Sequence, residues 1–143
     1  MKRIPPVEQL MTPLQHTINA ASSLKETKEY MYRNSLEHLA IVEDGEIIGS
    51  VTDECMKIVR ALSDDDRFEE KHTVGELCLR DPYVASASTR ADKVLAYMAE
   101  NGMSVALITR GEKLVGILTT SDICRAFIGF ARKQLGLEEE GSS

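Results

Sequence analysis

Apolar positions recur along the first half of this chain at two spacings, which predict its helices and strands. A spacing of three or four residues over 23–34, opened by the capping-box sequence Ser-Leu-Lys-Glu, predicts a helix. Two short apolar runs, 39–42 and 47–51, lie on either side of an Asp-Gly turn and predict a hairpin. One apolar face over 52–63 predicts a second helix. With a short strand at 17–18, the predicted order is strand, helix, strand, strand, helix.

The same order of elements returns in the second half of the chain. A strand is expected near 83–85, followed by a helix capped by Thr89 through the pattern Thr-x-x-Asp. Residues 104–118 predict a hairpin around an Arg-Gly-Glu turn. An apolar face that includes Phe127 predicts a last helix running towards Gly136.

An offset of 67 residues aligns the two halves, which indicates an internal duplication. A period this long, present twice, predicts two copies of one small α/β unit and not a solenoid of short repeats. The aligned pairs are Met31 with Met98, Asn34 with Asn101, Ile41 with Ile108, Ile47-Ile48 with Leu114-Val115, and Thr52 with Thr119.

The stretch from Gly116 to Asp122 is the strongest candidate for a ligand site. An apolar strand there runs into polar residues that open a helix, so unpaired amide groups and a positive dipole end are available to an anion. Gly116 would allow close approach of the ligand, and Thr119 and Asp122 supply oxygen atoms. The same residue types are also ordinary helix caps, and this alternative stays open for the isolated motif.

Composition bounds the class of protein. The chain has 143 residues, of which 43% are apolar and 28% charged, and these values are typical of a globular protein. The net charge of −6, without clustered Lys and Arg, argues against nucleic acid as a partner. Three dispersed cysteines, Cys55, Cys78 and Cys124, disfavour a disulfide framework and favour a cytoplasmic location. No apolar run predicts a signal peptide or a membrane span, so we expect no direct membrane binding.

Charged and flexible segments mark the expected boundaries. Residues 1–6 indicate an extended arm, and the polar stretch 138–143 a frayed end. The charge-rich stretch 63–73 predicts a solvated linker between the copies. Its three aspartates, Asp64 to Asp66, lack the glycine and spaced oxygens of a calcium loop, so we expect no metal site.

The sequence gives little support to an enzyme. The three histidines, His16, His38 and His72, lack a nucleophile partner in a recognisable motif, and no Gly-x-x-x-x-Gly-Lys phosphate loop is present. The cysteines on apolar helix faces fit small core residues better than zinc ligands. We therefore expect a protein that is not a catalyst and requires no cofactor.

With both copies in view, the chain resembles a tandem pair of CBS (cystathionine β-synthase) domains, the arrangement called a Bateman module. The resemblance rests on the repeated unit, on Met11-Thr-Pro13, and on Gly-h-h-Thr-x-x-Asp ending at Asp122, where h is apolar. It implies an α+β fold of two tandem β-α-β-β-α repeats packed about a pseudo-twofold axis. The expected division is repeat 1 at 7–62, an acidic linker at 63–73, repeat 2 at 74–130, and the helix end and tail at 131–143.

The resemblance implies a regulatory module that binds AMP, ADP, ATP or S-adenosylmethionine in a cleft between the repeats. In the main cleft Asp122 would accept hydrogen bonds from the ribose hydroxyls, and Thr119 would donate to a phosphate or ribose oxygen. Arg125 would reach the phosphates, unless it is simply a surface arginine. Backbone of the other repeat would read the adenine edge, with Ile18 and Leu39 sandwiching the ring. The expected main-cleft residues are His16, Thr17, Ile18, His38, Leu39, Ala40, Thr119, Asp122 and Arg125.

The second cleft departs from the family pattern, because Cys55 stands where Asp122 stands in the other copy. A thiol is too weak an acceptor to hold a diol, so we expect unequal sites. The expected residues of this weaker cleft are Thr52, Val84, Ala85 and Ser86. Exposed apolar helix faces suggest a homodimer, and the resemblance implies an effector protein that the sequence does not name. The alternative is a dimerisation or docking module that binds no small molecule.

Overall fold

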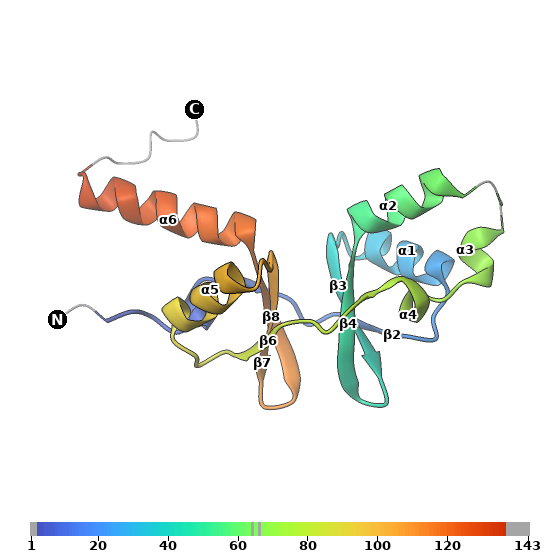
Figure 1. The fold of residues 1–143 in the computed structure, drawn as a ribbon, viewed down its shortest axis with the longest axis horizontal. Coiled ribbons are helices and arrows are strands. Elements are labelled where there is room, and N and C mark those ends of the chain that lie inside the picture. Colours follow the sequence, from blue (N-terminus) through green and yellow to red (C-terminus); the bar gives the residue numbers. More distant parts are fainter. Residues whose placement is uncertain (1–2, 64, 66, 137–143) are drawn as a thin grey trace. The chain divides into compact units, whose positions relative to one another are not determined.

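The computed structural model describes residues 3–63, 65 and 67–136, and these form two compact units. Unit 2 is the continuous segment His16–Pro82, and unit 1 combines the segment before it with the segment after it. Each unit contains one four-stranded sheet and its own helices (Figure 1). The mixed α+β fold and the duplication predicted from the sequence are confirmed.

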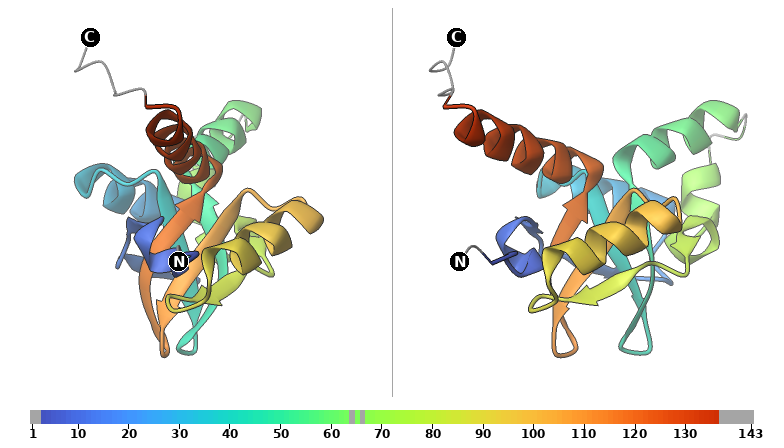
Figure 2. Two further views of the ribbon diagram at one scale, coloured as in Figure 1. Left: turned by 90° about the vertical axis from the view of Figure 1, so that its left-hand side faces the viewer. Right: turned by 60° about the vertical axis from the view of Figure 1, so that its left-hand side comes forward.

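Unit 1 is built on the strand order β1-β8-β7-β6. The central hairpin β7–β8 is antiparallel, β6 adds to it in parallel, and β1 pairs with β8 in antiparallel fashion. α5 packs on this sheet through Val94 and Met98, while α6 continues from the end of β8 beyond the sheet (Figure 2). The elements are η1 (Val7–Gln9, a 3-10 turn), β1 (Thr12–Pro13), β6 (Val84–Ser86), α5 (Ala91–Glu100), β7 (Val105–Arg110), β8 (Lys113–Thr119) and α6 (Thr120–Gln134).

Unit 2 repeats this arrangement with the strand order β2-β3-β4-β5. The hairpin β3–β4 is antiparallel, β2 is parallel to β3, and β5 is antiparallel to β4. The elements are β2 (Thr17–Asn19), α1 (Leu24–Arg33), β3 (His38–Glu43), β4 (Glu46–Thr52), α2 (Asp53–Leu62), α3 (Phe68–Lys71), α4 (Val74–Leu77) and β5 (Leu79–Arg80). No helix in the described ranges is long and apolar enough to cross a membrane.

Each compact unit is completed by a short segment from the other sequence repeat. β1 lies in the first repeat but pairs with β8, so that Thr12 faces Ile117 across the ladder. β5 lies in the second repeat but pairs with β4, with Leu79 opposite Ser50. The two pairings correspond under the offset of 67 residues. Because strands of two residues carry no measurable periodicity, the sequence did not predict them.

Gly116 has a packing role that the sequence did not suggest. A side chain at this position would collide with the side chain of Met11, which lies in the same unit just before β1. The glycine therefore makes room for Met11, and close approach of a ligand at Gly116 stays a prediction.

Each unit has its own apolar core between sheet and helices. Burying a Leu, Ile or Met side chain contributes about 1.5–3 kcal/mol, so these clusters supply most of the driving force for folding. The core of unit 1 contains Val7, Ala85, Ala87, Val94, Met98, Ala106, Ile108 and Leu118. The core of unit 2 contains Ala20, Leu24, Met31, Leu39, Ile41, Val51, Met56, Val74 and Cys78.

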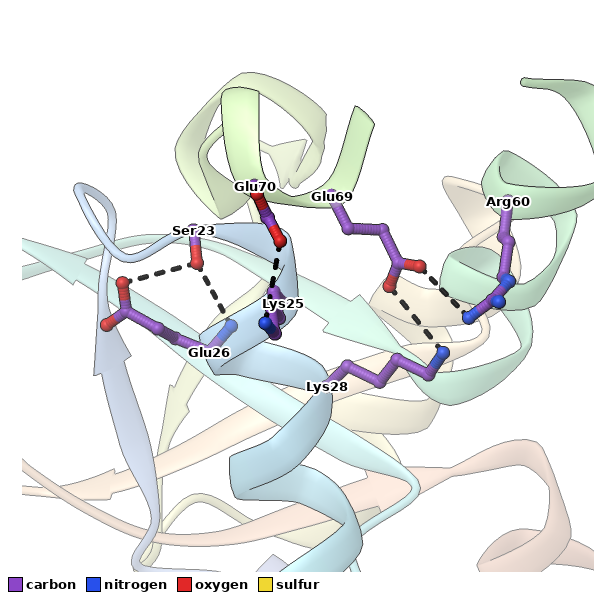
Figure 3. A network of polar contacts seen from close by, with 7 residues as sticks. All are labelled: Ser23, Lys25, Glu26, Lys28, Arg60, Glu69 and Glu70. Carbon is purple, nitrogen blue, oxygen red and sulfur yellow. Dashed lines mark hydrogen bonds and ion pairs between the residues drawn. The ribbon is translucent and has the colours of Figure 1, made fainter. Parts of the chain in front are cut away.

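The charge-rich stretch between the repeats is not simply a solvated linker. It contains α3, whose Phe68 packs against the core of unit 2. Glu69 pairs with both Lys28 of α1 and Arg60 of α2, at 3.6 and 3.1 Å, and Glu70 pairs with Lys25 (Figure 3). A single aromatic residue among charges gave no periodic signal, which is why the sequence missed this packing. Of the three aspartates considered for a metal, Asp64 and Asp66 lie outside the described residues, as do residues 1–2 of the expected arm and the tail 137–143.

Two helix caps differ in detail from those that the sequence predicts. The Ser23 hydroxyl accepts from the Glu26 amide at 3.0 Å as expected, but it donates to the Glu26 carboxylate itself at 3.2 Å (Figure 3). The prediction that Thr89 caps α5 is wrong, because the cap position is Arg90. Arg90 holds the Asp92 carboxylate through two hydrogen bonds of 2.7 Å, so this carboxylate is engaged by the guanidinium.

Candidate functional site

The junction between β8 and α6 is a capping box in which Thr119 and Asp122 hold each other. The Asp122 amide donates to the Thr119 hydroxyl at 3.3 Å, and the Thr119 amide donates to Asp122 Oδ2 at 2.8 Å. Thr119 has extended backbone angles, as the last residue of a strand, while its side chain starts the helix. The expected motif therefore forms the expected strand-to-helix turn.

Asp122 is only 6% exposed, and its carboxylate is surrounded by donors from unit 1. Oδ1 accepts from the Thr12 hydroxyl at 2.7 Å and from Arg125 Nη2 at 2.6 Å. Oδ2 accepts from the Thr119 hydroxyl at 3.0 Å in addition to the Thr119 amide. A carboxylate has about four acceptor positions, so the structure fills them all.

These contacts keep Asp122 ionised. Burial raises the pKa of this carboxyl, but the hydrogen bonds from Thr12, Thr119 and Arg125 outweigh it, and the net pKa lies below the usual value. The first turn of α6 adds a favourable dipole. The junction thus holds a buried negative charge at the first turn of α6, where the Thr120 amide donates to the Ser104 carbonyl and the Asp122 amide to the Thr119 hydroxyl.

The corresponding junction of unit 2 has the threonine cap but no carboxylate at the position of Asp122. The Thr52 hydroxyl accepts from the Cys55 amide at 3.0 Å, as Thr119 does from Asp122. Cys55, Ile58 and Leu79 occupy the positions of Asp122, Arg125 and Thr12 under the offset and the strand register. The carboxylate, its cation and its hydroxyl donor are therefore all replaced.

The other expected main-cleft residues lie on β2 and β3 of unit 2, except His16, which directly precedes β2. The His16 ring nitrogen Nδ1 is 2.8 Å from the Tyr30 hydroxyl, which orients the imidazole. Thr17 and Ile18 are half-buried and pair with β3. Leu39 is wholly buried in the core of unit 2, so the expectation that its side chain sandwiches an adenine ring is wrong. Neighbouring residues of a strand point to opposite faces, which places His38 and Ala40 on the other face of β3.

A hollow of about 500 Å³ at the start of α2 brings together two residues that the sequence assigned to different clefts. His38 and Thr52 are register partners across β3 and β4, and both line this hollow. Its lining contains three acidic residues and one lysine, which makes it unfavourable for a phosphate. The lining residues are Glu37, His38, Thr52, Asp53, Glu54 and Lys57.

The remaining residues of the expected weaker cleft lie on β6 of unit 1. Val84 is partly exposed, and the Ser86 hydroxyl lies 3.1 Å from that of Ser88. The Ala85 side chain belongs to the core of unit 1, so it offers a ligand only its backbone.

Thr12 is the one site residue that the sequence reasoning missed. It stood inside the family signature Met11-Thr-Pro13, but no role was given to its hydroxyl. Its contact with Asp122 spans 110 residues and depends on the β1–β8 pairing. The signature itself was the only signal that could have identified it.

Comparison with known proteins identifies the family and the fold. The CBS domain family model matches residues 7–56 and 74–129. The chain is 26% identical over 125 residues to L-aspartate semialdehyde sulfurtransferase of Methanocaldococcus jannaschii, a match that covers 86% of this chain and 23% of that protein. This chain therefore spans about a quarter of the curated relative's length.

Solved structures show the same fold. A CBS domain pair in complex with 5′-methylthioadenosine and S-adenosyl-L-methionine is 24% identical, with a TM-score of 0.71 over 90% of this chain and 99% of that chain. CBSX2 in complex with AMP is 22% identical, with a TM-score of 0.66 over 90% of this chain and 99% of that chain. An uncharacterized conserved protein from Pyrococcus horikoshii is 26% identical, with a TM-score of 0.66 over 89% and 95%. The family model covers both halves of the duplication, and the chain belongs to the CBS domain family.

Proposed function

We propose that this chain is a regulatory module that binds an adenine nucleotide or adenosyl compound through the β8–α6 junction. The observation that carries the proposal is Asp122, a buried carboxylate of lowered pKa on the first turn of a helix. An ionised carboxylate accepts two hydrogen bonds from a ribose diol, and each charge-assisted bond contributes about 1.5–3 kcal/mol before costs. Solved members of the fold in complex with 5′-methylthioadenosine, S-adenosyl-L-methionine and AMP support this ligand class.

The remaining contacts follow from the family resemblance. Thr119 would donate to a phosphate or ribose oxygen, and the backbone of 16–18 and 38–40 would read the adenine edge. Since Leu39 is part of the core, the apolar contact with the ring falls to Ile18. AMP, ADP, ATP and S-adenosylmethionine all carry the ribose diol, so they are the compounds to test.

The two junctions should bind unequally. Unit 2 presents Cys55 in place of the carboxylate and an acidic hollow beside it. We expect calorimetric titration to give one tight site per chain, with a second site weaker or absent. Two equal sites per chain would contradict the assignment.

Replacing Asp122 by Asn tests the proposal directly. The variant keeps the size of the side chain but removes the charge, and we expect at least about a hundredfold weaker binding, since two charge-assisted bonds are affected. Asp92→Asn is the matched control, because Asp92 lies on the first turn of α5 in the same unit and is exposed. Circular dichroism would check that both variants fold. An unchanged dissociation constant in Asp122→Asn would show the ribose assignment to be wrong.

A thermal-shift series with AMP, ADP, ATP and S-adenosylmethionine separates the ligand-binding module from a pure docking module. A ligand at a hundred times its dissociation constant adds about 2.7 kcal/mol to the free energy of unfolding. No response to any of the four compounds would favour the docking role.

We also propose that the chain acts as a homodimer that passes ligand binding to an effector protein, and not as a catalyst. The support is apolar surface on the helix that follows each junction: Leu62 is exposed at the end of α2, and Phe127 and Phe130 are exposed three residues apart on α6. Exposed apolar surface of this kind marks association sites. Light scattering at micromolar concentration should give twice the monomer mass, and a monomer mass would count against the dimer.

A further inference from the structure

Arg125 lies against the carboxylate that is proposed to hold the ribose. Its Nη2 donates to Asp122 Oδ1 at 2.6 Å, one turn along the same helix. The side chain of Arg125 is 69% exposed, whereas that of Asp122 is 6% exposed. A buried, fixed acceptor is thus paired with a cation that is free to move into solvent.

Two of the other three donors to Asp122 are held by the capping box of α6, namely the Thr119 amide and hydroxyl on Oδ2. The third, the Thr12 hydroxyl, belongs to an exposed residue of β1 and shares Oδ1 with Arg125. Since all four acceptor positions of the carboxylate are filled, the two ribose hydroxyls must displace two donors. The neutral Thr12 hydroxyl and the Arg125 guanidinium can both leave without moving the backbone, and Arg125 is the charged one of the two.

We infer that Arg125 occupies the ribose position of the empty site and selects phosphorylated adenine nucleotides over unphosphorylated adenosyl compounds. This inference rests on the proposed function. It assigns Arg125 two alternating partners, Asp122 without ligand and a phosphate with ligand.

The selectivity follows from the exchange of hydrogen bonds. Displacing Arg125 by a neutral ribose hydroxyl replaces a bond between two charged groups by one in which only the carboxylate is charged, so the exchange is unfavourable by itself. It becomes favourable when the released guanidinium finds another anion, because arginine binds phosphate through two parallel hydrogen bonds. A phosphate near the start of α6 would also be stabilised by the positive end of the helix dipole. AMP supplies such an anion, and adenosine does not.

The test is calorimetric titration of AMP and adenosine into the full chain and into Arg125→Gln. We expect AMP to bind Arg125→Gln about tenfold more weakly, because a charged partner of the phosphate is lost. Adenosine should bind equally well or more tightly, since the competing cation is gone. The dissociation constant of adenosine divided by that of AMP should therefore fall by about tenfold or more in Arg125→Gln. Arg132→Gln is the matched control, because it removes the same charge from the last turn of the same helix.

One outcome overturns the inference alone: the ratio of the two dissociation constants in Arg125→Gln stays as in the unchanged chain and in Arg132→Gln, whether or not both compounds bind more weakly. Loss of binding in Asp122→Asn would then leave the proposed function standing. If neither compound binds the unchanged chain, the inference fails, and the thermal-shift series with ADP, ATP and S-adenosylmethionine decides the proposed function. Arg125→Lys provides a second variant, since it keeps the charge without the planar fork and should give an intermediate ratio.

Discussion

The two strand-to-helix junctions of this protein share a threonine cap and differ in everything around it. In unit 1, Thr119 is followed by Asp122 with its donors Thr12 and Arg125. In unit 2, Thr52 caps α2 in the same way, while a thiol stands in place of the carboxylate. Unit 2 nevertheless has the same strand order and register. The fold therefore needs the cap but not the carboxylate, which supports a functional role for Asp122.

The most direct test of this difference is to place the cysteine of unit 2 at the position of Asp122 in unit 1. We expect Asp122→Cys to weaken nucleotide binding at least about a hundredfold, since a thiol cannot replace two charge-assisted bonds. It should also lower the free energy of unfolding by about 2–3 kcal/mol, because the donors around Asp122 lose a charged acceptor. Calorimetric titration and urea unfolding measure the two effects.

The reciprocal change provides the control for Asp122→Cys. Cys55→Asp places a carboxylate at the junction of unit 2 without its Arg and Thr partners, so it should restore no tight binding by itself. If Asp122→Cys binds nucleotide as tightly as the unchanged chain, the two junctions are equivalent for the ligand.

The sequence predicted the parts of this comparison that depend on local pattern. The hairpins and the motif ending at Asp122 follow from short stretches of neighbouring positions, and the duplication follows from the return of the same pattern after 67 residues. Thr12 was missed because it reaches Asp122 only through a strand of two residues, across 110 positions. Leu39 was assigned to the ligand by the family resemblance, and the apolar run 39–42 could not correct this, because it does not reveal which face of the strand is buried. Contacts between distant segments and the facing of short strands are set by packing, which local pattern does not contain.

Removing each threonine cap should show which junction depends on its cap more. Thr52→Val removes one hydrogen bond to the Cys55 amide and should cost about 1 kcal/mol. Thr119→Val removes the same cap and also the hydroxyl that donates to Asp122 Oδ2, so we expect a cost of about 2 kcal/mol. Urea unfolding of the two variants measures the difference. Equal losses in the free energy of unfolding would indicate that the Thr119 hydroxyl contributes only as a helix cap and not through its bond to Asp122.

The smallest expected effect is a difference between the two junctions in how their contribution to stability depends on pH. The folded pKa of Asp122 lies below its ordinary value, so the stability it contributes is complete above pH about 4 and is lost as pH falls through the folded pKa. Unit 2 has Cys55 and no carboxylate at this position, so its junction lacks the corresponding contribution. The exposed carboxyls Asp65, Glu76 and Asp92 also have lowered pKa values, because each is held by hydrogen bonds from neighbouring groups.

Asp122→Asn isolates the contribution of Asp122 to this acid sensitivity, because the three exposed carboxyls are retained in the variant and cancel. We expect the free energy of unfolding of the unchanged chain to fall more steeply between pH 5 and pH about 2.5 than that of Asp122→Asn, since only the former must protonate a buried, hydrogen-bonded carboxylate. Urea unfolding at a series of pH values measures both slopes. Parallel curves would show that the carboxylate is not preferentially ionised in the folded state. The difference between the Asp122 and Cys55 side chains would then be one of shape and not of charge.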